Sequence, residues 1–168
     1  MTTGQMLITV AAMLLLSLLV LRVSSTTIVT QESMQNSKFG VLATSLANSI
    51  LEEASMKFFD ENSIGTFITD VNDLTNTVDF GIEAGENSDS VETFDDFDDF
   101  HNYTKTYDNL PSAVFVVTCE VTYVDPDIGG LVTANRTWHK MIIVNVTNPS
   151  VNMNPLVFRK VFSYWKFL

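Results

Sequence analysis

Residues 6–23 read MLITVAAMLLLSLLVLRV, and Arg22 is their only charged side chain. As an α-helix, this stretch would span about 27 Å at about 1.5 Å per residue, close to the roughly 30 Å hydrocarbon thickness of a bilayer. So long an apolar surface is costly to leave in water. We therefore expect the helix to lie in a membrane, against other subunits, or in each at different times.

A secretory signal peptide is one alternative for this segment. Signal peptides carry a basic region ahead of the apolar one, but residues 1–5 (MTTGQ) contain neither Lys nor Arg, and no clear cleavage site of small residues follows. A helix that anchors a single copy of the chain in a membrane is the stronger alternative. Arg22 at the far end disfavours the usual inward N-terminus, because basic residues favour the cytoplasmic side.

The next residues are poor helix formers. Residues 24–30 read SSTTIVT, and the last five are all β-branched, so each loses side-chain freedom in a helix. We predict that the helix is interrupted or loosened over residues 24–30 in the assembled state. The first unit of the chain is thus residues 1–30, a membrane anchor or filament core.

A second helical pattern covers residues 31–59. Its apolar side chains recur at steps of three and four residues, which is typical of one face of an amphipathic helix. This stripe predicts a packing surface for the domain that follows. Its members are Phe39, Leu42, Leu46, Ile50, Ala54 and Phe58.

Residues 60–111 are acidic and rich in Asn and Ser. The whole chain has 168 residues and a net charge of −11, and fourteen of its acidic side chains fall between residues 60 and 108, against one lysine. We expect a long loop region with short elements, and its scattered phenylalanines argue against disorder. Such a charge balance repels phosphates, so nucleic-acid binding is excluded.

Residues 112–168 have the pattern of an antiparallel sheet. Residues 113–124 alternate, with Ala113, Phe115, Val117, Cys119, Val121 and Tyr123 on one face. A turn cluster follows at 125–130 (DPDIGG), a second strand is expected within 131–147, and a third over 156–167. Sequential strands joined by short turns indicate an α+β fold, in which the helix packs on an antiparallel meander. The globular head is then residues 31–168.

This order of elements resembles the type IV pilins and the pseudopilins of type II secretion. Residues 1–8 (MTTGQMLI) are similar to the start of mature pilins, with Gln5 where the family has a glutamate. Residues 94–101 (FDDFDDFH) resemble an Asp-rich element that precedes the sheet in some pseudopilins. The family is made with a short basic leader that a peptidase removes, and this numbering shows none before Met1.

The resemblance implies a subunit that waits in the inner membrane and then joins an extracellular filament on the cell surface, helped by a pilus assembly machinery. Its partners would be other copies of itself. The assembly candidates are Gln5, Ala11, Ala12, Leu15 and Leu18. The alanines would allow helices to approach closely, the leucines would lie in the apolar core of the filament, and Gln5 stands where the family has its glutamate. The alternatives are a minor pseudopilin of a secretion or assembly machine, and a monomeric, membrane-anchored binding domain outside the cytoplasm.

Few residues suggest chemistry. His101 and His139 lack metal-ligand spacing, and none of the common catalytic motifs is present, so we expect no enzymatic activity. Cys119, the one cysteine, falls on the apolar face of its strand and is expected to be a small buried residue. Three glycosylation sequons begin at Asn102, Asn135 and Asn145.

The best candidate site is the group of Asp95, Asp96, Asp98 and Asp99. Four carboxylates in five residues repel one another unless they are solvated or neutralised, and calcium prefers such oxygen ligands. The spacing does not match an EF-hand loop, so a solvated acidic turn held to the core by its phenylalanines is the alternative. Calcium is the only cofactor that the sequence suggests.

Overall fold

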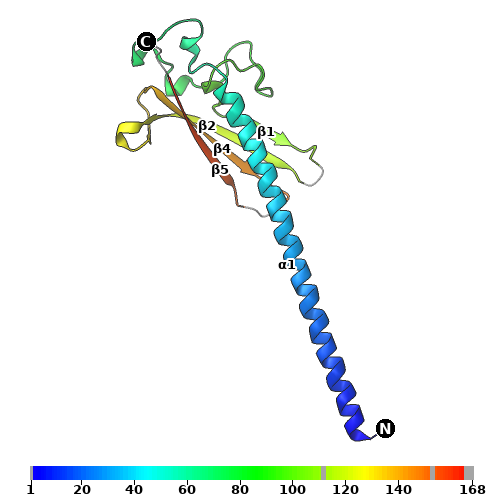
Figure 1. Ribbon diagram of the computed structural model, residues 1–168. Coiled ribbons are helices and arrows are strands. Elements are labelled where there is room, and N and C mark those ends of the chain that lie inside the picture. Colours follow the sequence, from blue (N-terminus) through cyan, green and yellow to red (C-terminus); the bar gives the residue numbers. More distant parts are fainter. Residues whose placement is uncertain (1, 111–112, 152–153, 165–168) are drawn as a thin grey trace. The chain divides into compact units, whose positions relative to one another are not determined.

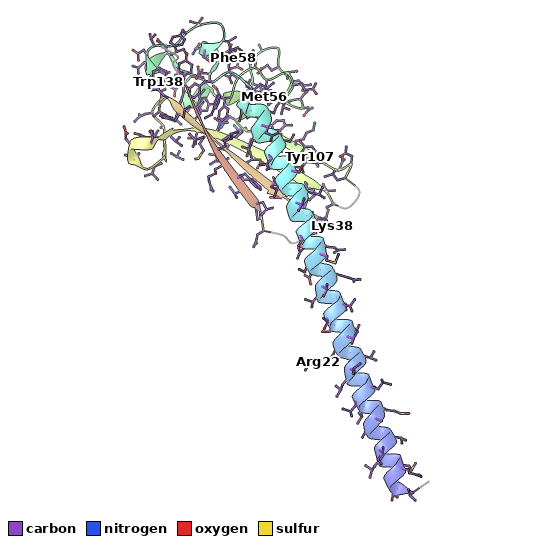
Figure 2. All side chains as sticks on the ribbon, viewed as in Figure 1. Arg22, Lys38, Met56, Phe58, Tyr107 and Trp138 are labelled. Atoms are coloured by element: carbon purple, nitrogen blue, oxygen red, sulfur yellow. The ribbon has the colours of Figure 1, made fainter. Side chains whose placement is uncertain are left out.

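One helix takes up the first third of the protein. The computed structural model describes residues 2–110, 113–151 and 154–164. The helix, α1, extends from Thr3 to Ser55 without a break. The chain divides into two units, residues 1–40 and residues 41–168. Over residues 6–34 the apolar side chains of α1 are exposed on every side of the helix, as the stretch around Arg22 in Figure 2 shows, and Phe39 is the first apolar residue of the helix to be buried.

The helix continues through residues 24–30 in the single chain. The hydroxyls of Thr26, Thr27 and Thr30 each donate to a carbonyl oxygen four residues earlier, at 2.9 Å. These bonds satisfy the side chains within the helix, where threonine hydroxyls often bond in this way. Our prediction of a loosened segment concerned the assembled state, so it stays a prediction.

The buried face of residues 41–55 differs by about one position from the predicted stripe. Ala43, Ala47, Ile50, Leu51 and Ala54 are buried, whereas Leu42 and Leu46 are half-buried. Alanine occupies three of these five buried positions, so small side chains make up most of this face.

Phe58 does not belong to this face. It is 52% exposed, and its inclusion in the stripe was wrong because α1 ends at Ser55. Beyond that residue the helical period no longer decides which side a residue faces. Phe59, the next residue, is buried instead.

A five-stranded antiparallel sheet forms the second layer (Figure 1). Its order is β1-β2-β4-β5, and β3 pairs with the far end of β2. The predicted α+β class and the meander of β2, β4 and β5 are confirmed. The segment 131–147, expected to hold one strand, forms two, and β1 lies within the expected loop region. The strands are β1 (Thr104–Tyr107), β2 (Phe115–Asp125), β3 (Leu131–Thr133), β4 (His139–Thr147) and β5 (Leu156–Ser163).

The predicted buried face is confirmed, since Ala113 and the odd-numbered residues of β2 from 115 to 123 are buried. The alternation itself ends at Val121, because residues 122 and 124 are buried as well. On β4 the even-numbered positions share that face, because Tyr123 pairs with Lys140 and Val121 with Ile142. Three of these positions hold valine or isoleucine, and Lys140 is the exception. A lysine therefore sits at one end of the apolar face.

Aromatic side chains anchor the acidic region to the core of the head. Phe59, Phe80, Phe94, Phe97 and Phe100 are buried, which confirms that this region contributes to the core. Among its described residues, the regular structure consists of β1 and of four short 3₁₀ helices, η1 (Glu61–Ser63), η2 (Val71–Asp73), η3 (Thr77–Asp79) and η4 (Asp98–Phe100).

Candidate functional site

The apolar part of α1 is the first candidate site. Among the described residues, α1 is the one helix long and apolar enough to cross a membrane, with a mean hydropathy of 2.5 over its best window, and no part of that window is buried. The predicted assembly residues Ala11, Leu15 and Leu18 are spaced so that they share one face of the helix. Ala12 adjoins that face.

Gln5 has a local partner at the start of the helix. Its side-chain oxygen accepts a hydrogen bond from the backbone N–H of Thr2 at 3.3 Å. A glutamine or glutamate that reaches back by three residues is half of a capping box, which satisfies one of the free N–H groups at a helix start. In the single chain Gln5 therefore stabilises the first turn of α1.

The second candidate site is a buried cluster around Lys140. Its Nζ atom donates to Asp60 Oδ2 at 2.8 Å and to the carbonyl oxygen of Phe59 at 2.9 Å, and it also contacts Asp98 Oδ1. The side chains of Lys140 and Asp60 are fully buried, and that of Asp98 is 1% exposed. The cluster thus ties β4 to two parts of the acidic region.

Aromatic rings enclose the lysine head. Nζ lies 4.9 Å from the ring centres of Phe59 and Phe80 and 5.5 Å from that of Tyr123. At these distances a ring face attracts a cation, most strongly where water is excluded. The rings keep water from the ion pair and leave the two carboxylates as the groups that balance its charge.

Asp60 is the better satisfied of the two carboxylates. As the N-cap of η1 it accepts from the backbone N–H of Asn62 at 3.2 Å. It also accepts from both the backbone N–H and the hydroxyl of Thr75, each at 3.0 Å. In contrast, Asp98 Oδ2 has no hydrogen-bond partner among the described residues.

This cluster was missed by the sequence analysis. A lysine in phase with the apolar positions 142, 144 and 146 was the available signal, but the run MIIV at 141–144 hides the alternation. A buried ammonium and carboxylates are tolerated only when they are paired, and removing one partner typically costs about 3–5 kcal/mol. The phase of a charged residue in a strand therefore predicts a buried ion pair.

The four aspartates of the calcium hypothesis do not converge on one point. Asp96 Oδ1 accepts from the backbone N–H groups of Asp98 and Asp99, at 2.8 and 3.2 Å. Asp99 Oδ2 accepts from those of Asp95 and Asp96, both at 3.0 Å. Asp98 turns to Lys140, and Asp95 is exposed. Two of the four carboxylates, those of Asp96 and Asp99, therefore hold the turn itself together.

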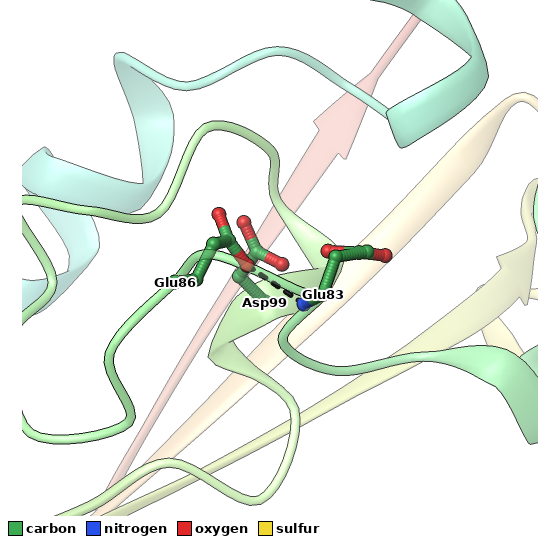
Figure 3. A group of neighbouring side chains, drawn as sticks. All are labelled: Glu83, Glu86 and Asp99. Carbon is green, nitrogen blue, oxygen red and sulfur yellow. Dashed lines mark hydrogen bonds between the residues drawn. The ribbon is translucent and has the colours of Figure 1, made fainter.

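A different set of carboxylates does converge. Glu83, Glu86 and Asp99 have oxygens within 4.8 Å of one another (Figure 3). Burial, reinforced by Asp99, raises the pKa of Glu83 to about 8, and burial also raises that of Asp99 to about 6. A divalent cation would relieve this repulsion. The sequence analysis missed both glutamates because they lie eight or more residues before the Asp-rich element.

The histidines and the cysteine are in structural positions. His101 Nδ1 accepts from the backbone N–H of Val121 at 3.2 Å, and His139 Nδ1 lies 2.7 Å from the hydroxyl of Ser163. Cys119 is buried as predicted, and burial raises the pKa of its thiol to about 12. A thiol of that pKa is not a nucleophile at neutral pH. The absence of enzymatic activity stays a prediction.

The three sequons differ in accessibility. Asn102 and Asn135 are exposed, whereas Asn145 is half-buried in the central strand β4. Asn102 also has a left-handed backbone, with φ of 63°. Glycosylation at these positions stays a prediction, and it is sterically easiest at the first two.

Comparison with models of known protein families, with curated proteins and with solved structures gives no match. The likeness to pilins therefore rests on architecture. A long apolar N-terminal helix, packed through its C-terminal part on an antiparallel sheet, is a pilin-like arrangement.

Proposed function

We propose that this chain is the structural subunit of a type IV pilus-like extracellular filament that polymerises through its N-terminal helix. The observation that carries the proposal is the contrast along α1. Its residues 6–23 are apolar and exposed on every side, whereas residues 41–168 have a core of their own. The first part therefore needs a partner that a single chain does not supply.

Before assembly that partner is the inner membrane. The helix is long enough to cross a bilayer and would wait there for the assembly machinery. In the filament, neighbouring copies would replace the lipid, and Ala11 and Ala12 would let the helices approach closely. No catalytic step and no cofactor are required for this role.

The heads would then form the outer surface. The net charge of the chain is −11, and most of the acidic side chains lie in residues 60–108. Charge of one sign keeps surfaces soluble and apart. Filaments of this protein would therefore stay dispersed at low salt and would associate more readily when salt screens the charge.

Two other functions share the same helix. A minor pseudopilin would have the same fold but would not form the bulk of a polymer. A monomeric, membrane-anchored binding domain would use the helix only to cross the bilayer, for which its length is sufficient. Both are separated from the proposal by what the purified chain does when detergent is removed.

The test is negative-stain electron microscopy of the full chain after detergent removal. We expect filaments from the wild type and none from Leu15→Asp or Leu18→Asp, because either change places a charge in the helix bundle. Val132→Asp is the matched control, since Val132 is 59% exposed on β3 and the change adds the same charge to the head. Normal filaments from the Leu15 and Leu18 variants, or single copies of the wild type, would overturn the proposal.

A further inference from the structure

We propose that Lys140 and Asp98 join covalently, forming an intramolecular isopeptide bond between Nζ of the lysine and the side-chain carbonyl carbon of the aspartate. Asp60 acts as the carboxylate that moves protons during the reaction. The bond would fasten η4 of the acidic region to the central strand β4. This inference does not depend on the filament, because every group that it uses belongs to the head.

The two reacting groups already touch in a closed site. Nζ contacts Asp98 Oδ1, and both side chains are almost completely buried. Groups held together in this way react as if at very high concentration, about 10⁵ M or more in well-oriented cases. The amine and the carboxyl group therefore do not need to find each other by diffusion, because folding has already brought them together.

Burial also favours the product over the ion pair. An ammonium and a carboxylate keep a large desolvation penalty in an apolar site, whereas an amide is neutral and costs much less to bury. The walls formed by Phe59, Phe80 and Tyr123 limit the return of water. Hydrolysis of the new bond is hindered for the same reason.

Hydrogen bonding distinguishes the roles of the two aspartates. Asp60 is fixed by its bonds to Asn62 and Thr75 and is also 3.4 Å from the hydroxyl of Tyr123. Those hydrogen bonds hold its two oxygens in place. Asp98 Oδ1 contacts Nζ, and the Asp98 side chain otherwise meets that of Asp96, so Oδ1 can leave without breaking a hydrogen bond to a further group. Asp98 is the acyl donor and Asp60 the proton carrier.

The reaction needs no other reagent. One Nζ proton passes to Oδ1 of Asp98, the oxygen that later departs, and the freed lone pair of Nζ attacks Cγ. A second Nζ proton moves through Asp60 Oδ2, which lies 2.8 Å away, to the departing oxygen. The Nζ–Cγ bond forms, one Cγ–O bond breaks, and the oxygen leaves as water with both protons. One proton remains on the amide nitrogen, and Asp60 is regenerated.

The bond would supply a staple that this chain otherwise lacks. With a single cysteine, no disulfide can form within the chain. Residues 98 and 140 are 42 positions apart, and a covalent link that closes such a loop restricts the unfolded chain, as a disulfide does. Ahead of β1, the described residues of the acidic region form only short 3₁₀ helices as regular structure, so this part of the head gains most from the link.

The decisive experiment is the intact mass of the denatured, full-length wild-type chain. We expect it to fall short of the sequence mass by one water, and we expect trypsin to leave the chain uncut after Lys140 and to yield a branched peptide that joins residues 98 and 140. Lys160→Arg, on the exposed side chain of a lysine in β5, should keep the same deficit. The full sequence mass, with normal cleavage after Lys140, would overturn the proposal and leave a buried ion pair.

Two variants assign the groups. Asp98→Asn should lose ammonia in place of water, because the leaving group is then an amide nitrogen, and this shift identifies residue 98 as the acyl donor. Asp60→Asn should show the full sequence mass, because the proton carrier is gone. A water deficit in Asp98→Asn would contradict the assignment of Asp98, and an unchanged deficit in Asp60→Asn would contradict that of Asp60.

Discussion

Residues 6–23 of α1 and residues 139–147 of β4 are both rich in apolar side chains, and each segment contains a single lysine or arginine. Arg22 stands exposed on its helix, whereas Lys140 is enclosed by two aspartates and three aromatic rings. Lys140 finds its partners within the chain, whereas the apolar side chains of residues 6–23 are exposed. The difference separates two kinds of mutation, those that weaken the head and those that prevent assembly.

The largest effect on the head is expected from Lys140→Ala. The change leaves Asp60 and Asp98 buried without a counter-charge, which should lower the free energy of unfolding by about 3–5 kcal/mol. Urea unfolding followed by tryptophan fluorescence would measure it, since Trp138 stacks on Tyr164 in the head. Lys160→Ala should change stability by less than about 0.5 kcal/mol. Equal stability of the two variants would mean that the cluster is dispensable.

A pair of alanines on the same helix sharpens the comparison. Ala47 is completely buried, so Ala47→Leu should overfill its site and destabilise the head by about 1–3 kcal/mol. Ala12→Leu should leave head stability unchanged, because Ala12 is exposed in the single chain, but should reduce filament yield. Both variants are compared by urea unfolding and by electron microscopy. A stability loss in the Ala12 variant would remove the distinction between the two parts of α1.

Calcium should act on the head alone. If Glu83, Glu86 and Asp99 bind the ion, calcium at about ten times its dissociation constant should add about 1.4 kcal/mol by mass action. EDTA should reverse the gain, and Glu86→Gln should abolish it. Asp95→Asn is the matched control, because Asp95 is exposed and lies outside this group. Identical melting curves with calcium and with EDTA would leave the carboxylates as a turn without an ion.

The smallest effect concerns pH. The pKa of Glu83 in the folded chain is about 8, against a usual value of 4.5, so the native state binds more protons than the unfolded state between these values. Head stability measured in EDTA should therefore decrease as pH rises from 5 to 8, and Glu83→Gln should flatten that slope. Glu52→Gln, at an exposed position, should not. A slope that is equal in both variants would exclude Glu83 as its origin.

The sequence predicts a residue's environment well when that environment is set by residues close to it along the chain. The apolar face of β2 and the anchoring role of Phe94, Phe97 and Phe100 were readable, because alternation and composition report burial directly. Phe58 was wrongly assigned to the buried stripe because the helix ends at Ser55. Packing sets the end of a helix, and the spacing of apolar residues does not report it.

The clusters were beyond local patterns. Asp98 of η4 and Lys140 of β4 meet only because the acidic region folds beside that strand, and Glu83 meets Asp99 only through the path of a loop. The sequence showed that the Asp-rich element was unusual and suggested a solvated turn or calcium. It did not show that one of these aspartates faces a lysine in the central strand.

Electron cryo-microscopy of the polymer made by the wild-type chain tests the central claim most directly. We expect a helical array with residues 6–23 packed together at its centre and the heads outside. The same map will show whether residues 24–30 remain helical in the polymer. A chain that stays monomeric without detergent, or a polymer joined through its heads with the apolar helices facing outwards, would contradict it.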